Sequence, residues 1–253
     1  MSPRTSVIIC THQMRETLPG AIASVREQTT ADWEIVILDD ASTDGTWEYL
    51  TALASSQIRV FRNRQRLGVV KSRNRLLREA RGEFFSVLDA DDRFFPDKLE
   101  RHAAVLTARA EVGVVWGRAE VVRGDGITSV PEPGFVPGWD IVAPYRVIHS
   151  ATTWRRAALL SVGGYDESLY CEEAPDAFLR VGDHFLQHFD DGLAARKHLA
   201  VGTEFRKYWE ENQREISASL LLKTLTRRYG LNKGPLVERI KLRMNDKGLH
   251  ERQ

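Results

Sequence analysis

The stretch Val87-Leu88-Asp89-Ala90-Asp91-Asp92 decides how this chain is interpreted, because an apolar run ends there in three carboxylates within four positions. The run from Phe84 to Leu88 is typical of a buried strand, so the acids would lie at its carboxyl end. Carboxylates one residue apart can hold a hard divalent cation, and Mg²⁺ or Mn²⁺ usually shares such a site with substrate phosphates. A metal bound to a nucleotide diphosphate is our first hypothesis, and a solvated acidic turn before a helix near Pro96 is the alternative.

A second strand delivers acids in the same way. The apolar stretch from Trp33 to Leu38 ends in Asp39 and Asp40. In an open α/β sheet, ligands bind in the crevice outside the carboxyl ends of the strands. Acids after two strands therefore predict one binding site, although both also suit the turn Ser42-Thr43-Asp44-Gly45 as caps.

The composition is that of an ordinary globular chain. Its 253 residues are 42% hydrophobic and 28% charged, enough for one large domain with an appendage. A net charge of +1 gives no electrostatic case for nucleic acid as a partner. The two cysteines, Cys10 and Cys171, fit a reducing compartment, and we expect Cys10 to act as a small hydrophobe in a core strand.

No stretch is typical of a secretory signal or of a membrane-spanning helix. The first apolar run, Val7 to Cys10, is far shorter than a signal core, and no run approaches the roughly 20 apolar residues that cross a bilayer. We therefore expect a soluble, cytoplasmic protein, which still leaves room for a peripheral contact with a membrane surface.

Strand and helix patterns alternate through the first half of the chain, and this order predicts an α/β fold with a doubly wound, mostly parallel sheet. After Val112 to Val122 the alternation stops, and residues 123–147, with four prolines, form an irregular segment of the kind used for binding loops. The expected strands are Ser6 to Cys10, Trp33 to Leu38, Ile58 to Phe61 and Phe84 to Leu88, and the expected helices are Leu18 to Glu27, Thr46 to Ala54, Val69 to Ala80 and Asp97 to Ala110.

Two enzyme classes can be set aside at the end of the first strand. A dinucleotide-dependent oxidoreductase would need a glycine-rich turn there, and a sugar nucleotidyltransferase would need a loop rich in glycine and lysine. Thr11-His12-Gln13-Met14 is neither.

Several blocks of the sequence follow one another in an order found in one enzyme family. They are Val7 to His12, Val36 to Thr46, Leu67 to Asn74, Ala80 to Glu83, Leu88 to Asp92, Gly163 to Leu169 and Asp176 to Arg180. Together they resemble the family-2 glycosyltransferases of the GT-A fold. The resemblance implies a Rossmann-like nucleotide-sugar-binding half over residues 1–122 and an acceptor-side half over 123–200. The residue pattern separately predicts a helical C-terminal extension over 201–253. The resemblance further implies an inverting, metal-assisted enzyme with a UDP- or dTDP-sugar donor.

Carried over residue by residue, the resemblance places Asp40 against the nucleobase, where a carboxylate accepts the N3–H of uracil or thymine. Cytosine has an acceptor at that position, which argues against a cytidine donor, whereas guanosine is disfavoured only by the habit of the family. Thr11 and Arg73 would belong to the same nucleotide site. A solvated helix face is the alternative for Arg73.

The resemblance makes Asp91 the direct ligand of Mn²⁺ or Mg²⁺. Asp89 would contact the ribose, the metal or its bound water. A metal there would neutralise the diphosphate leaving group. We assign Asp92 to capping the segment that follows.

The general base is the point at which this chain departs from the family. An inverting transfer needs a base to deprotonate the acceptor, but the chain reads Glu172-Glu173-Ala174-Pro175-Asp176, and the family's base position falls on Ala174. We expect Glu173 to serve, with Asp176 as the second choice, and capping of a helix that begins near Pro175 as the alternative for both. Because of this difference, the alternative stays open that the protein is a non-catalytic relative that binds a nucleotide sugar or a partner protein.

The acceptor side carries weaker signals. His149 and Asp166 are candidates there, with a purely structural role as the alternative for His149. His184 and His188 have the spacing of one helix face, but no third zinc ligand accompanies them. The acceptor itself stays open between a small molecule, a peptide, a glycan and a lipid-linked substrate.

The C-terminal tail is basic. From Lys223 to Gln253 there are nine Lys or Arg against three Asp or Glu. Such a tail would suit a membrane surface or a partner protein, and a solvated helical face is the plainer alternative.

Overall fold

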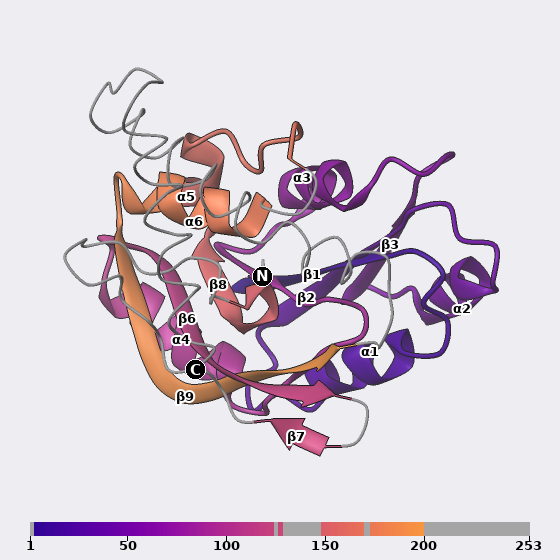
Figure 1. Ribbon diagram of the computed structural model, residues 1–253, viewed down its shortest axis with the longest axis horizontal. Helices are drawn as coiled ribbons and strands as arrows, with labels where there is room; N and C mark the ends of the chain where they lie inside the picture. Colours follow the sequence, from indigo (N-terminus) through magenta and orange to yellow (C-terminus); the bar gives the residue numbers. More distant parts are fainter. Residues whose placement is uncertain (1–2, 124–125, 129–147, 170–172, 200–253) are drawn as a thin grey trace, which may run out of the picture. The chain divides into compact units, whose positions relative to one another are not determined.

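In a computed structural model of the protein, residues 3–123, 126–128, 148–169 and 173–199 are described (Figure 1). The chain divides into two compact units, Met1–Leu199 and Ala200–Gln253, and every described residue belongs to the first. The basic tail, the helices expected over 201–253 and most of the irregular segment 123–147 lie outside the described residues.

Parallel strands form the first half of the sheet, in the order β3-β2-β1-β4. The inner strands β1 (Thr5–Thr11) and β2 (Trp33–Asp39) are buried almost throughout, because helices cover both faces of the sheet. Beside them lie β3 (Ile58–Arg62) and β4 (Phe84–Val87). The strands and helices expected in this half are confirmed, with boundaries that differ by one or two residues.

The second half of the sheet is mixed. Strand β8 (Thr152–Arg155) pairs antiparallel with β4 and with β6 (Val112–Arg123), and β6 runs parallel to β9 (Leu186–Leu199). The short strands β5 (Arg93–Phe94) and β7 (Gly126–Thr128) pair with β9 and β6. The mostly parallel α/β sheet is therefore confirmed, and each of its antiparallel pairs includes a strand that the pattern of the first half does not predict.

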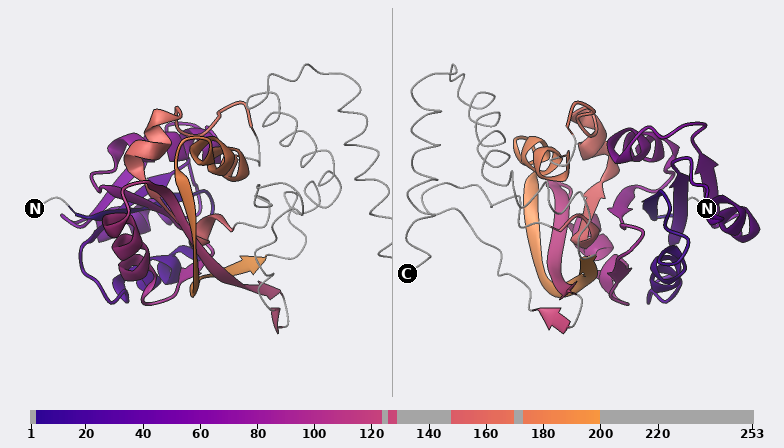
Figure 2. Two further views of the ribbon diagram at one scale, coloured as in Figure 1. Left: turned by 90° about the vertical axis from the view of Figure 1, so that its left-hand side faces the viewer. Right: turned by 45° about the vertical axis from the view of Figure 1, so that its right-hand side comes forward.

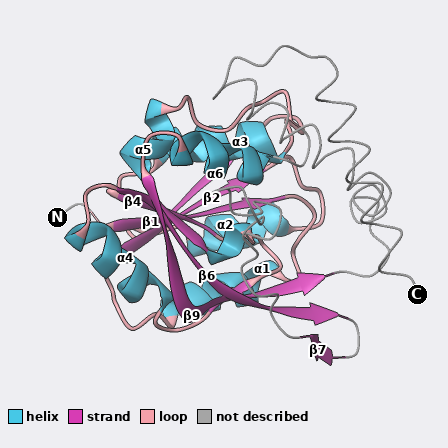
Figure 3. Ribbon diagram, turned by 60° about the vertical axis from the view of Figure 1, so that its left-hand side comes forward, coloured by secondary structure: helices cyan, strands magenta, loops and turns pink. Residues whose placement is uncertain are grey.

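Helices cover both faces of the sheet, and Figure 3 shows α3, α5 and α6 on one side of the strands with α1 and α4 on the other. Successive residues of β1 point to opposite faces, so Val7 and Ile9 belong to one hydrophobic cluster and Ile8 to another. The helices on the Val7 side are α1 (Leu18–Arg26), α2 (Thr46–Leu53) and α4 (Lys98–Ala108), and those on the Ile8 side are α3 (Val69–Glu79), α5 (Arg156–Ser161) and α6 (Glu173–Gly182).

Strand β9 brings a distant part of the chain to the carboxyl end of β4. It runs beside β6 in both views of Figure 2. Its residue Arg196 pairs with Arg93 of β5, which begins directly after Asp92. The sheet therefore carries the next residues, Lys197 and His198, to the acidic turn.

The structure contradicts the interpretation of the histidine pair and agrees with that of Cys10. The shared helix face expected for His184 and His188 is wrong, because α6 ends at Gly182 and His188 lies in β9 with its Nδ1 3.1 Å from Arg109. Cys10 lies in β1 as a free thiol whose pKa burial raises to about 12, in agreement with an unreactive small side chain. Cys171 lies outside the described residues.

Asn74 ties α3 to the turn that follows α5. Its side-chain amide donates to the carbonyl of Tyr165 at 2.8 Å and accepts the N–H of Tyr165 at 2.9 Å. The neighbouring Gly164 has a φ of 74°, and a Cβ at that position would lie 2.7 Å from Oδ1 of Asn74. Backbone conformation and close approach both require glycine there, so this joint between the two halves has a fixed geometry.

We predict that Asn74→Ala lowers the free energy of unfolding by about 2 kcal/mol, because both backbone groups of Tyr165 lose their side-chain partner. Urea unfolding followed by circular dichroism measures the change. Lys71→Ala, at an exposed position of the same helix, is the control and should change the free energy by no more than about 0.5 kcal/mol. Equal effects of the two substitutions would contradict the prediction.

Candidate active site

The acidic turn Asp89-Ala90-Asp91-Asp92 lies directly after β4, and Arg73 of α3 is buried against it. One guanidinium nitrogen of Arg73, Nη2, is 2.6 Å from Oδ1 of Asp89, and the other, Nη1, pairs with Glu173 at the start of α6. Burial alone would lower the pKa of Arg73, but Asp89 and Glu173 raise it above the usual value. The solvated helix face considered for Arg73 is therefore wrong.

Lys197 of β9 also contacts the acidic turn. Its Nζ is 3.2 Å from Oδ2 of Asp89 and 3.3 Å from Oδ2 of Asp92. Burial by itself would raise the pKa of Asp89, but Lys197 and Arg73 hold it well below its ordinary value. Asp89 therefore stays ionised, with each of its oxygens already paired to a cation.

Asp92 is fully buried and fastens the turn to β9. Its carboxylate accepts the backbone N–H of His198 at 3.0 Å and the hydroxyl of Ser150 at 2.5 Å. Burial raises the pKa of Asp92 to about 7, against the opposing effect of Lys197. The capping role expected for Asp92 is wrong, because its carboxylate faces β9 and the short helix η2 (His149–Ala151) instead of the start of α4.

Asp91 is the member of the turn that remains available. It is half-buried, and its carboxylate has no ion-pair partner among the described residues. Burial and the neighbouring Asp89 raise its pKa. Within the described part of the chain, the buried Nδ1 of His198 also lacks a hydrogen-bond partner.

These two groups fit a divalent cation that completes its shell with substrate and water. A carboxylate oxygen and an imidazole nitrogen are both metal donors, and Mg²⁺ is commonly held by one or two carboxylates together with substrate phosphates. The described residues contain no ready-made group of three His, Cys, Asp or Glu ligands. Sequence reasoning missed His198, because nothing in the sequence signalled that β9 returns to the acidic turn.

The residues expected on the donor side lie at the carboxyl ends of β1 and β2. Asp40 is buried and accepts the N–H groups of Leu67 and Gly68 at 2.9 and 2.8 Å and the amide of Asn63 at 2.7 Å. It thereby fixes the loop that leads into α3. The buried hydroxyl oxygen of Thr11 has no partner among the described residues. Contact of either residue with a nucleotide stays a prediction.

Asp39 has the turn role considered for it. Its Oδ1 accepts the N–H of Ser42 at 3.1 Å, and its Oδ2 is 3.1 Å from Nε of Arg62. The two acids after β2 therefore differ, since Asp39 organises its own turn and Asp40 holds a neighbouring loop.

On the acceptor side, Glu173 and Asp176 are both buried in α6 but have different partners. One oxygen of Glu173 pairs with Arg73, and the other, Oε2, has no partner within the described residues. Burial raises the pKa of Glu173, which Arg73 opposes. Asp176 pairs with Arg180 at 2.7 Å, and Arg180 also donates to the carbonyls of Val162 and Gly164. Glu173 therefore faces the site, whereas Asp176 supports the turn after α5.

His149 and Asp166, the two weaker candidates on the acceptor side, form hydrogen bonds with nearby residues. The Nε2 of His149 is 2.9 Å from the hydroxyl of Tyr165, and its buried Nδ1 has no partner among the described residues. Burial and Arg73 lower the pKa of His149 well below its usual value, so the ring is neutral. Asp166 accepts the N–H of Ser168 at 2.9 Å in a local turn.

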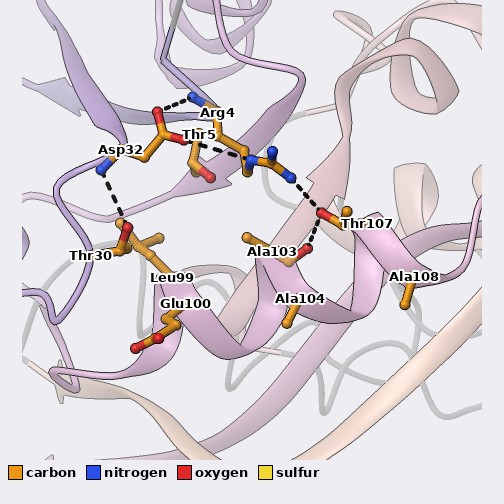
Figure 4. Close-up of a pocket in the computed structure, with 10 residues that line it drawn as sticks. All are labelled: Arg4, Thr5, Thr30, Asp32, Leu99, Glu100, Ala103, Ala104, Thr107 and Ala108. Atoms are coloured by element: carbon orange, nitrogen blue, oxygen red, sulfur yellow. Dashed lines mark hydrogen bonds and ion pairs between the residues drawn. The ribbon is translucent and has the colours of Figure 1, made fainter.

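A separate shallow pocket of about 390 Å³ lies at the other end of the strands (Figure 4). Arg4, just before β1, reaches Thr107 of α4 at 2.7 Å and lies 3.6 Å from Asp32. Because Arg4 precedes β1 and Thr11 ends it, this pocket is remote from the acidic turn. The candidate site is therefore the acidic turn and not this pocket.

Residues 6–149, more than half of the chain, match the family described as glycosyl transferase family 2. The chain belongs to this family. The protein is therefore a glycosyltransferase, and the family expected from the sequence blocks is confirmed.

Among similar proteins whose names include glycosyltransferase, EpsE of Bacillus subtilis (strain 168) is 31% identical over 200 residues, which are 76% of this chain and 68% of EpsE. The UDP-Glc:alpha-D-GlcNAc-diphosphoundecaprenol beta-1,3-glucosyltransferase WfgD of Escherichia coli is 30% identical over 124 residues. That match spans 49% of this chain and 49% of WfgD, so it covers only about half of each protein.

Solved structures share the fold of this family-2 enzyme. S. aureus TarS 1-349 in complex with UDP-GlcNAc matches with a TM-score of 0.73 and 19% identity, over 95% of this chain and 71% of TarS 1-349. The mannosyltransferase PcManGT from Pyrobaculum calidifontis, in complex with GDP-Man and Mn²⁺, matches with a TM-score of 0.65 and 19% identity, over 97% of this chain and 69% of PcManGT. At these identities the likeness supports the GT-A fold alone.

We predict that Asp176→Asn lowers the free energy of unfolding by about 3 kcal/mol, because it leaves the guanidinium of Arg180 without its buried counter-ion. Nucleotide affinity should stay within about twofold, since the Asp176 carboxylate does not contact the acidic turn. Thermal and urea unfolding measure the stability.

The matched control is Asp97→Asn, which removes an exposed pair of the same i,i+4 spacing with Arg101. It should cost no more than about 0.5 kcal/mol. A stable Asp176→Asn variant that binds nucleotide but has lost donor turnover would reverse the two roles assigned to the acids of α6.

Proposed function

We propose that the protein is an inverting glycosyltransferase that transfers a sugar from a UDP- or dTDP-sugar with the help of Mn²⁺ or Mg²⁺. One observation carries the proposal. Within the described residues the carboxylate of Asp91 has no ion-pair partner, whereas that of the neighbouring Asp89 is paired with Arg73 and Lys197. This pair follows β4 at the same edge of the sheet where β1 and β2 end.

Recognition of the base is assigned to Asp40. Its Oδ2 accepts one hydrogen bond, from Gly68, which leaves acceptor capacity for the N3–H of uracil or thymine. TarS with UDP-GlcNAc and the name of WfgD, which includes UDP-Glc, support a uridine donor. PcManGT with GDP-Man makes guanosine the donor to test against it.

Departure of the nucleotide is assigned to the acidic turn. Asp91 and the nearby His198 are the residues that would hold the divalent ion, and the ion would neutralise the diphosphate as it leaves. Asp89, paired through both oxygens, orients the turn and would contact the ribose. PcManGT with Mn²⁺ supports the use of a divalent ion.

Activation of the acceptor is assigned to Glu173. Its unpartnered Oε2 can accept the proton of an acceptor hydroxyl, and its raised pKa favours that step. Arg73 joins Glu173 to Asp89, so the base and the donor site are held by one side chain. Ala174 motivates the second candidate, a relative that binds nucleotide sugar without turning it over.

The acceptor stays open between a small molecule, a peptide, a glycan and a lipid-linked substrate. The name of WfgD, with its diphosphoundecaprenol acceptor, supports the lipid-linked class. No helix in the described part of the chain has the length and apolar character needed to cross a membrane. A peripheral membrane or protein contact of the basic tail remains part of the proposal.

We predict that UDP or dTDP binds in the presence of Mn²⁺, that EDTA weakens this binding at least about tenfold, and that Asp91→Ala has the same effect as EDTA. Isothermal titration calorimetry with UDP, dTDP, GDP and CDP measures it. Asp32→Ala removes an equal charge at the far pocket and should leave the affinity unchanged. Binding of none of the four nucleotides would contradict the donor assignment.

We predict that Glu173→Gln lowers donor turnover by about 10²-fold or more while nucleotide affinity stays within a few-fold, because an amide oxygen can still accept a hydrogen bond from Arg73, which keeps Asp89 as a counter-ion, but cannot take up a proton. Release of UDP from UDP-sugars, by transfer or slow hydrolysis, is the assay. Glu111→Gln, at an exposed acid, is the charge-matched control. Full turnover by Glu173→Gln would rule Glu173 out as the base, and nucleotide binding without turnover by the wild type would favour the non-catalytic candidate.

A further inference from the structure

Lys197 lies between two carboxylates of a site that is expected to hold a metal. Its ammonium is within 3.3 Å of both Asp89 and Asp92. The lysine comes from β9, far from these acids along the chain, and β5 pairs with β9 at the adjacent Arg196. The sheet therefore sets its position, and the side chain remains about 26% exposed, which leaves it room to move.

The ammonium of Lys197 occupies a carboxylate oxygen that could otherwise coordinate a divalent ion. Oδ2 of Asp89 is bound to Lys197, and Oδ1 of Asp89 is bound to Arg73. A metal that approaches the free protein therefore finds Asp91 as the open carboxylate of the turn, and it meets two positive charges close by. Both effects weaken metal binding.

We propose that Lys197 competes with the divalent cation for Asp89 and Asp92, so that the free protein binds metal weakly and takes it up together with the nucleotide diphosphate. This inference rests on the proposed function for the identity of the second ligand. The competition for the carboxylates is a property of the protein alone.

The diphosphate relieves the competition because it offers Lys197 another anionic partner. A lysine ammonium is a good phosphate ligand. Once Lys197 turns to a phosphate oxygen, Oδ2 of Asp89 becomes free for the cation. Metal and nucleotide then strengthen each other's binding, and by linkage the factor is the same in both directions.

A structural role for Lys197 makes a different prediction. If the lysine only fastens the turn to β9, its removal would loosen Asp89 and Asp92 and would leave metal affinity unchanged or weaker. Competition predicts the opposite, a tighter metal site in the absence of nucleotide.

The experiment is a titration of the full chain with Mn²⁺, with free Mn²⁺ measured by electron paramagnetic resonance, without nucleotide and with saturating UDP. Without nucleotide, Lys197→Met should bind Mn²⁺ about tenfold more tightly than the wild type, and the strengthening by UDP should shrink by a similar factor. Lys197→Arg keeps the charge and should behave as the wild type does.

The matched control is Arg196→Met, which removes one positive charge from the neighbouring residue of β9, where Arg196 pairs with Glu120 at 2.7 Å. Its affinity for Mn²⁺ should stay within about twofold of the wild type, because exposed charges are screened. Lys197→Gln carries the same expectation as Lys197→Met if the methionine variant does not fold.

Unchanged or weaker Mn²⁺ binding by the neutral variants would overturn the proposal. A wild type that binds UDP without any change in Mn²⁺ affinity would overturn it as well. Failure of UDP to bind to any variant would instead contradict the proposed function, and the comparison without nucleotide would still decide the role of Lys197.

Discussion

The buried guanidinium of Arg73 is the interaction on which the rest of the site depends. It pairs with Asp89, which follows β4, and with Glu173, which begins α6. Loss of Arg73 would leave Glu173 buried without its counter-ion and Asp89 with Lys197 alone, a far larger cost than that of a surface pair. A single side chain of α3 thus sets the distance between the residue assigned to the donor and the residue assigned to the acceptor.

The site contains more acidic than basic side chains, and the two cations neutralise part of the negative charge. Four carboxylates lie close to two cations; the acids are Asp89, Asp91, Asp92 and Glu173, and the cations are Arg73 and Lys197. Burial raises the pKa of three of these acids, whereas the two cations keep Asp89 ionised. Such a cluster attracts a cation and tolerates its absence, which is what a protein needs if its metal arrives and leaves with a substrate.

The sequence predicted the position of those site residues that depends only on the strand directly before them. Asp91 and Asp40 follow apolar strands of a parallel sheet, so their common edge follows from strand direction alone. The position of His198 depends on pairing between β9 and β5, and no local pattern signals such a pairing. Asp92 was misassigned for the same reason, because the groups that its carboxylate accepts from belong to β9 and η2.

The parallel pairing of β6 with β9 also has a consequence for how the chain is made. Of the two cations that neutralise Asp89, Arg73 precedes it, but Lys197 is 108 residues further along the sequence. During synthesis the acidic turn therefore emerges long before Lys197, and Arg73 alone of these two cations is available to Asp89 until β9 has joined the sheet. Charge balance at this site is a property of the finished sheet, and a peptide that holds the aspartates alone does not possess it.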